Sequence, residues 1–326
     1  MKYYLGIDAG GSKTEAVILN EEGKIIGFGR SGPGNYEIAG INSAKENWLL
    51  AIERAKRNLK DIKFEKACFG LAGADFPEDF EMLKKEIENL SIAKDFCIEN
   101  DTAIALRAGT KDYWGIIIVM GAGTNGYGRR KDGKSFRFYG EGYIFGDWGG
   151  ASSVAQEMLH YAFRSYDGRG EKTILEKIVL EFFSVNNFDE LAKKLYYYHE
   201  ERYKALNLAP YLFKAIEEGD LVAKKIGERI VDETVKGVYA LMKKLELMKE
   251  ETPVILAGSL YKGAPWLKEY ISAKIHIFAD KAKVEILKIP PALGAGIIAW
   301  EMDGNILSSE KWEEFLNFNY NTSETL

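Results

Sequence analysis

The chain has 326 residues, of which 46% are hydrophobic, so it is long enough for two domains that each bury a core. Its formal net charge of -5 excludes a strongly basic surface, and with it nucleic acid or an anionic membrane as the main partner. The start "MKYYLGID" lacks the long apolar segment of a signal peptide, and no apolar run is long enough to span a membrane. We therefore expect a cytoplasmic protein. Its two cysteines, Cys68 and Cys97, rule out a disulfide framework within one chain.

The first predicted elements are three strands joined by a glycine turn and a charged turn, over "LGIDAGGSKTEAVILNEEGK" and the following "IIGFG". The spacing of the glycines resembles a P-loop, but Ser12 stands where that motif needs lysine, and a β-branched strand follows where it needs a helix. A glycine turn in a hairpin can still bind phosphate. Gly10 and Gly11 let backbone N–H groups approach an anion, and Ser12 and Thr14 add hydroxyl donors.

Two charged residues flank this turn. Asp8 follows the predicted strand Tyr3–Ile7 and is expected to face the same space as the glycines. A carboxylate beside phosphates needs a cation between them, and Mg²⁺ is the usual one. Lys13 either faces solvent or contacts phosphate, and the sequence leaves both open.

The next elements are an amphipathic helix over 41–59, a strand ending in "GLAG", a helix from about Pro77, and the strand "DFCIEN". The two helices are expected to cover the sheet. Asp101 follows "DFCIEN" and precedes the helix "TAIALRAG", so it projects from the carboxyl end of a strand, where open α/β sheets bind ligands. It is a candidate general base, a helix cap, or both.

The opening pattern occurs twice. Residues 115–138 read "GIIIVMGAGTNGYGRRKDGKSFRF", and a shift of 110 places Gly11 on Gly121 and Thr14 on Thr124. "FGLAGAD" (69–75) is echoed by "VILAGSL" (254–260). "GAGTNG" also matches a dinucleotide-binding fingerprint, but a strand follows it where that fingerprint opens a helix.

Each half therefore predicts β-β-β-α-β-α-β-α, with a cleft between two glycine hairpins. We expect an α/β fold of two duplicated domains, the first over 1–112 and the second over 113–290. The second carries a helical insert over about 149–251, and 303–326 form an acidic tail. "LYYYHEERY" (195–203) in the insert is expected to be helix core or a dimer surface.

Together the two hairpins, "ENDT", "LAGSL" and "PPALGA" resemble the actin–hexokinase superfamily, and within it the BadF/BadG-type ATPase family that contains N-acetylglucosamine kinase. The resemblance covers residues 3 to about 300. It implies an α/β fold of duplicated ribonuclease H-like (actin-like ATPase) domains, in which the helix 291–302 returns to the first domain. It implies ATP and Mg²⁺ as cofactors and Asp101 as the catalytic base. The phosphate and adenosine residues it implies are Gly10, Gly11, Ser12, Lys13, Thr14, Gly121, Ala122, Gly123, Thr124, Gly258 and Ser259, with Asp8 at the metal. The sugar residues it implies are Asn35, Gly73, Asn100, Asp101, Glu141 and Asp147.

Two segments depart from the family pattern. Ala122 replaces a threonine in the second phosphate motif, and Glu141 and Trp148 replace a Trp and a Glu in the sugar segment "GEGYIFGDWGG". The resemblance implies a homodimeric kinase that phosphorylates the 6-hydroxyl of N-acetylglucosamine, with the insert walling the adenine pocket. A broad-specificity hexokinase, a glucosamine kinase and an ATPase that activates a partner enzyme are the alternatives. A sugar sensor would need a DNA-binding domain, which we do not expect in a chain that opens on the first strand.

Overall fold

A computed structural model of the chain describes residues 1–57, 59 and 62–318. The chain divides into two compact units, which are described separately. Unit 1 comprises Met1–Ile117, Tyr127–Ser135 and Leu287–Leu326, and unit 2 comprises Ile118–Gly126 and Phe136–Ile286. The end of the predicted acidic tail, 319–326, lies outside the described residues.

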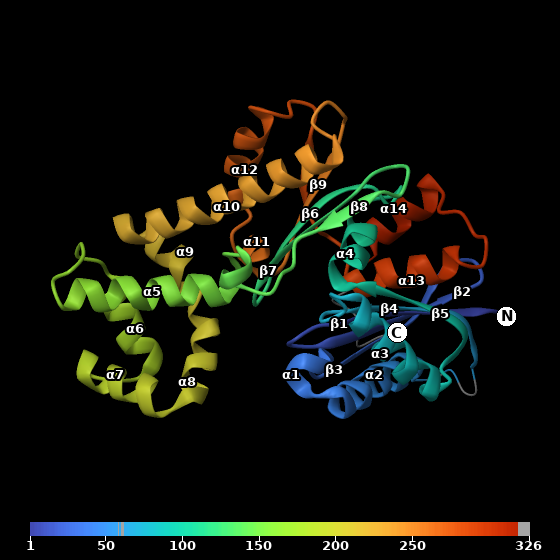
Figure 1. Ribbon diagram of the computed structural model, residues 1–326, viewed down its shortest axis with the longest axis horizontal. Coiled ribbons are helices and arrows are strands. Elements are labelled where there is room, and N and C mark those ends of the chain that lie inside the picture. The colour runs from blue at the N-terminus through green and yellow to red at the C-terminus, as the bar shows by residue number, and fades with distance from the viewer. Residues whose placement is uncertain (58, 60–61, 319–326) are drawn as a thin grey trace. The chain divides into compact units, whose positions relative to one another are not determined.

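Unit 1 contains a five-stranded sheet with helices on both faces (Figure 1). Its elements are β1 (Tyr3–Ala9), β2 (Thr14–Asn20), β3 (Ile25–Ser31), α1 (Tyr36–Ala39), α2 (Ile41–Lys56), β4 (Phe64–Leu71), α3 (Pro77–Leu90), β5 (Ala93–Asn100), α4 (Asp101–Gly109), α13 (Pro291–Glu301) and α14 (Ser309–Asn317). The strand order is β3-β2-β1-β4-β5. β1 pairs antiparallel with β2 and parallel with β4, so the hairpin and the crossover connections meet at the central strand.

One face of this sheet is covered by α2 and α3, whose apolar stripes supply the core. Trp48 from α2 is fully buried and packs edge-on against Phe69 of β4, with ring centroids 6.2 Å apart. Leu83 and Ile87 bring α3 onto the same cluster. The predicted amphipathic helices therefore cover the sheet as expected, because their apolar positions recur at helical spacing.

The other face is covered by α13 and α4. A Cβ added to Gly6 of β1 would lie 2.1 Å from Gly296 N, so α13 crosses the central strand at backbone contact. Arg107 of α4 is 1% exposed and makes two hydrogen bonds to the Glu301 carboxylate, from Nε (3.1 Å) and a terminal nitrogen (2.7 Å). These contacts attach α13 to the N-terminal sheet and to α4.

Unit 2 contains most of the second sheet and the helical insert. The elements after unit 1's first stretch are β6 (Gly115–Met120), β7 (Thr124–Arg129), β8 (Ser135–Arg137), η1 (Tyr143–Phe145), α5 (Gly150–Tyr166), α6 (Leu175–Phe183), α7 (Phe188–Tyr197), α8 (His199–Lys204), η2 (Ala205–Leu208), α9 (Pro210–Glu217), α10 (Leu221–Leu245), β9 (Pro253–Ala257), α11 (Ser259–Gly263), α12 (Leu267–His276) and β10 (Lys283–Ile286). The strand order is β10-β9-β6-β7-β8, and the boundary between the units passes through β6, β7 and β8.

The predicted β-β-β-α-β-α-β-α order is confirmed in both halves, and α5 to α10 form the predicted insert between β8 and β9. None of the helices in the described part of the chain combines the length and apolar character needed to cross a bilayer.

Candidate active site

The first glycine turn joins β1 to β2. Gly10 N donates to Lys13 O (2.9 Å), and Gly10 O accepts from the backbone of Gly34 and Asn35, so the turn and the loop after β3 are held together. Thr14 is fully buried and its hydroxyl donates to Gly32 O (2.9 Å). The structure therefore places the Thr14 hydroxyl in the scaffold behind the turn. Ser12 is exposed and Gly11 half-buried, so the outer part of the turn is accessible.

Asp8 lies at the base of this turn in a strongly acidic setting. Burial, followed by the negative charges of Glu15 and Asp101, raises its pKa to about 8, and Lys13 opposes this shift. A carboxyl whose pKa is raised in this way is stabilised by a nearby cation. A cation bound at Asp8 would therefore offset the negative charge around it.

We expect Asp8→Asn to raise the free energy of unfolding of the metal-free protein, and the gain to grow as the pH rises. The folded-state pKa is raised from 3.8 to about 8, so the folded protein keeps a proton that the unfolded chain loses, and stability falls across this window. The asparagine does not titrate. Urea unfolding with EDTA at about pH 5 and about pH 8 measures the effect.

The control is Asp112→Asn, which removes a carboxylate whose side chain is 70% exposed. An equal change in stability at both pH values for Asp8→Asn would contradict the raised pKa.

Asn100 and Asp101 mark the junction between β5 and α4. Asn100 is the N-cap: its side-chain oxygen accepts from Thr102 N (3.0 Å), and its amide donates to Ala74 O (3.2 Å) and to the Asp75 carboxylate (3.1 Å). Asp101 is the first residue of the helix, half-buried, and its charge acts on Asp8. Asn100, and not Asp101, therefore caps the helix.

A second polar group in unit 1 surrounds Asn35. Asn35 caps α1 through a hydrogen bond from Glu37 N (2.8 Å), and it is 8% exposed. Gly73 has a φ of 86° and lies against Asn35 and Glu37, where an added Cβ would be 3.0 Å from oxygens of both side chains. The structure thus brings together Asn35 and Gly73, two residues that the sequence analysis assigned to the sugar.

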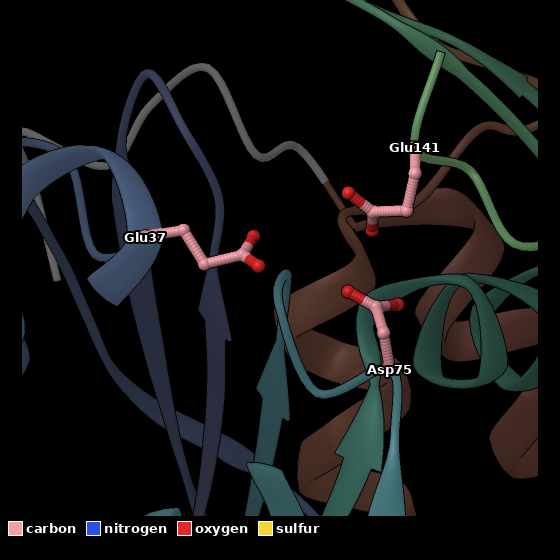
Figure 2. Close-up of side chains that lie close together, drawn as sticks. All are labelled: Glu37, Asp75 and Glu141. Atoms are coloured by element: carbon pink, nitrogen blue, oxygen red, sulfur yellow. The ribbon is translucent and has the colours of Figure 1, made fainter. Parts of the chain in front are cut away.

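Sequence analysis missed two acids in this group, Glu37 and Asp75. Their carboxylate oxygens lie within 4.8 Å of each other, and Figure 2 shows Glu37 on α1 and Asp75 on the loop after β4. Burial, and then the charges of Asp75 and Asp79, raise the pKa of Glu37. Each acid stands two positions after a residue assigned to the sugar: Glu37 after Asn35 in "GNYE", and Asp75 after Gly73 in "GAD". This short spacing is the sequence signal that could have found them.

Unit 2 builds a second turn between β6 and β7. Gly121 N donates to Gly123 O (3.0 Å), and the oxygens of Gly121 and Ala122 accept from the first amides of α5, on Ala151 and Ser152 (2.9 Å each). The Thr124 hydroxyl donates to Val119 O (3.0 Å). The turn and the N-terminus of α5 therefore form one rigid piece of backbone.

The "LAGS" segment after β9 packs on the same turn. Gly258 has a φ of 107°, and a Cβ there would lie 2.1 Å from Met120 O, so this position accepts only glycine. Ser259 begins α11 directly after it. Within unit 2 the structure thus gathers the predicted second phosphate motif and the predicted adenosine motif.

A cavity of about 340 Å³ lies in the helical insert. It is lined by Ser152, Ala155, Gln156 and Leu159 of α5, Leu195 of α7, Arg202 of α8, and Ala205 and Leu206 of η2. Ser152, one of the lining residues, donates its backbone N–H to Ala122 O in the second turn, so the cavity adjoins that turn. Its walls are mainly apolar with a few polar groups, as in sites for small organic ligands.

Asp147 organises the loop that carries Glu141. Its carboxylate accepts a hydrogen bond from Gly142 N (3.2 Å). Burial raises the pKa of Asp147 overall, although the backbone of this loop opposes the shift. The tip of this loop, Tyr143–Phe145, is exposed. Glu141, also labelled in Figure 2, belongs to this unit 2 loop.

We expect Asp147→Ala to speed cleavage of this loop by chymotrypsin roughly tenfold or more, because hydrogen bonds to a charged acceptor contribute about 1.5–3 kcal/mol each. Asp147→Asn keeps one acceptor oxygen and should fall between wild type and alanine. Mass spectrometry of early fragments, with cleavage after Tyr143 and Phe145, measures the rate.

Asp132→Ala is the matched control, since Asp132 accepts from Lys134 N (3.1 Å) in a different turn. If the alanine variant of Asp147 is cut no faster than this control, the carboxylate does not hold the loop.

Comparison with known proteins identifies the fold first. The chain resembles a solved structure from Chromobacterium violaceum, provisionally named an N-acetylglucosamine kinase, with a TM-score of 0.74 at 20% identity over 92% of this chain and 99% of that one. Together with the two five-stranded sheets, this makes the fold a duplicated actin-like ATPase fold.

The family follows from the sequence. The family model of the BadF/BadG/BcrA/BcrD ATPase family matches residues 5–299, and the chain belongs to that family. It is 31% identical over 312 residues to an N-acetylmuramic acid/N-acetylglucosamine kinase of Clostridium acetobutylicum, covering 92% of this chain and 98% of the relative. It is 26% identical over 309 residues to an N-acetyl-D-glucosamine kinase of Dictyostelium discoideum, covering 91% and 97%. The resemblance inferred from the motifs is confirmed.

Proposed function

We propose that this protein is an ATP-dependent sugar kinase that transfers the γ-phosphate of ATP to the 6-hydroxyl of N-acetylglucosamine or a related hexose or hexosamine. Membership of an ATPase family supports ATP as the donor. The two curated relatives, each matched along more than nine-tenths of its length, are both named kinases of N-acetylated amino sugars. These names support the class of acceptor.

Asp101 is proposed as the general base. Phosphoryl transfer depends mainly on positioning and on charge neutralisation, and a carboxylate near the acceptor hydroxyl takes its proton late in the transfer. Asp101 lies at the start of α4, directly after β5, and its charge acts on Asp8. β1, β4 and β5 run parallel, so Asp8 and Asp101 lie toward the same edge of the sheet, and this placement is the observation that carries the proposal.

Magnesium is proposed as the cofactor ion at Asp8. A bound Mg²⁺ would neutralise charge on the phosphate oxygens and would lower the pKa of Asp8 from its raised value. Gly10, Gly11, Ser12 and Lys13 would contact phosphate from unit 1. Gly121, Ala122, Gly123 and Thr124 would do so from unit 2.

The nucleoside end is proposed to lie against Gly258 and Ser259, with the helical insert contributing a wall. Support comes from the packing of Gly258 on the second turn and from the cavity that begins at Ser152, whose apolar walls and few polar groups suit a nucleobase.

The acceptor sugar is proposed to bind the group around Asn35 and Gly73, with Asn100 and Asp101. Glu37 and Asp75 join this set, because carboxylates that lie close together accept hydrogen bonds from neighbouring sugar hydroxyls. From unit 2, Glu141 and Asp147 are proposed to act on the sugar, Asp147 through the loop that it holds.

An assay of ADP release across several sugars tests the function. The panel is N-acetylglucosamine, N-acetylmuramic acid, glucosamine, glucose, mannose and N-acetylmannosamine. The proposal expects fastest turnover with an N-acetylated sugar and a product phosphorylated at the 6-position. Equal turnover of neutral hexoses would favour the broad-specificity hexokinase, and ADP release that no sugar stimulates would reject the kinase.

The activator alternative needs cysteines that hold an iron–sulfur cluster between subunits. Cys68 and Cys97 are free cysteines that stand opposite each other in the register of the neighbouring strands β4 and β5, and Cys68 is fully buried. Burial raises the pKa of the Cys68 thiol, which disfavours the thiolate that iron requires. The proposed kinase therefore uses neither cysteine, and a brown protein with an iron signal would revive the activator.

We also propose that the protein is a homodimer and that it is located in the cytoplasm. Tyr196, Tyr197 and Tyr198, which the sequence left as helix core or dimer surface, are 69%, 70% and 56% exposed. Exposed neighbouring aromatic residues are typical of protein interfaces, and light scattering on the purified protein tests the dimer.

A further inference from the structure

Glu15 is a buried acid that none of the roles above uses. It lies on β2, is 1% exposed, and pairs in register with Asp8 across the antiparallel β1–β2 ladder. Residues directly opposite each other in such a ladder project to the same face of the sheet. Glu15 and Asp8 therefore lie side by side behind the first glycine turn, and among the charges on Asp8 the influence of Glu15 exceeds that of Asp101.

The two oxygens of the Glu15 carboxylate have different surroundings. Oε1 accepts from Arg30 Nε (2.9 Å) and from a terminal Arg30 nitrogen (2.5 Å), and Lys13 Nζ lies 2.8 Å from it. Oε2 is buried and has no hydrogen-bond partner among the described residues. All the cationic contacts of Glu15 are therefore on one oxygen, and the other keeps its full acceptor capacity.

This arrangement is costly unless something else binds there. Like charges directly opposite each other destabilise a sheet, and a buried acceptor without a partner costs about 1–3 kcal/mol. Lys13 and Arg30 offset the charge at Oε1 but leave Oε2 unsatisfied. A hydrated cation at Asp8 would satisfy it, because Mg²⁺ usually keeps several waters, whose hydrogens need acceptors.

We propose that Glu15 is a positioning residue of the cation site at Asp8, with Oε2 accepting a hydrogen bond from a metal-bound water while Lys13 and Arg30 fix the carboxylate through Oε1. This inference rests on the proposed function, which places the cation at Asp8. Outer-shell partners of this kind typically change metal affinity by about 10- to 100-fold.

Direct binding of Mn²⁺ in the presence of saturating ADP, followed by electron paramagnetic resonance, tests the proposal without requiring turnover. Glu15→Gln keeps the size and an acceptor for Arg30 but puts an N–H donor at the Oε2 position, so we expect Mn²⁺ affinity to fall at least about tenfold. Glu86→Gln, which breaks a pair between Lys45 and Glu86 at 2.5 Å, is the matched control and should bind like the wild type.

Two results would overturn the inference: Mn²⁺ affinity unchanged in Glu15→Gln, or an equal loss in Glu15→Gln and in the control Glu86→Gln. If Glu15→Gln does not fold, Glu15→Asp, which keeps the charge but shortens its reach, should weaken Mn²⁺ binding, and wild-type affinity in it would reject the role. A wild-type protein that binds Mn²⁺ but phosphorylates no sugar would reject the proposed kinase separately.

Discussion

Asp101→Asn should bind ATP as the wild type does and lose turnover by about 10³-fold. The asparagine keeps the shape of the side chain but cannot accept the proton of the acceptor hydroxyl. Asn100 provides the helix cap through its bond from Thr102 N (3.0 Å), so the fold around α4 should survive the change. Turnover is measured by ADP release with the best sugar, and ATP binding by calorimetry.

Asp95→Asn is the control for this variant. Asp95 lies on the same strand, β5, with its side chain 57% exposed and paired to Lys66. It should retain the turnover of the wild type. If Asp101→Asn turns over as fast as this control, Asp101 is not the base. If ATP affinity falls by the same factor as the rate, Asp101 contributes to nucleotide binding instead.

Gly294→Ala should lower the free energy of unfolding by about 3 kcal/mol or more, the upper range for overpacking of a core. An added Cβ at Gly294 would lie 2.0 Å from Ile104 O and 2.7 Å from Ala108 N, both backbone atoms of α4. Since neither atom can move without shifting the helix, α13 would be pushed off its partner. Urea unfolding measures the change.

Gly296→Ala is the matched control, on the same helix and two residues later. Its added Cβ would meet Leu19 at 3.5 Å, which is ordinary contact. Alanine is the better helix former by about 1 kcal/mol, so this variant should be equal to the wild type or more stable. Similar losses in both variants would show that close approach of the two helices is not the cause.

Much of the fold was predictable because its signals are local. The strand "TEAVILN" was predicted from its β-branched residues and is β2, Thr14–Asn20. The boundaries of the individual helices of the insert were not predicted, because most of them are short and their caps are set by tertiary contacts such as Asp220 to Thr173.

The site was predictable at the level of motifs and less so at the level of single atoms. The glycines of both turns are at least partly exposed, and the charge of Asp101 acts on Asp8. The roles that the motifs assign to them remain predictions. It uses the Thr14 hydroxyl and the Asn100 amide for internal hydrogen bonds, and it buries Glu15. Which partner a polar side chain finds depends on residues far away in the chain, and no local pattern encodes that.

The position of α13 has a consequence for biosynthesis. The helix that covers β1 begins at Pro291, so almost the whole chain must leave the ribosome before the first strand acquires its cover. Until then the apolar face of the N-terminal sheet remains open to water and to other nascent chains. Completion of unit 1 therefore waits until α13 has been synthesised, and a chain truncated before Pro291 should aggregate or recruit chaperones even though every residue of that sheet is present.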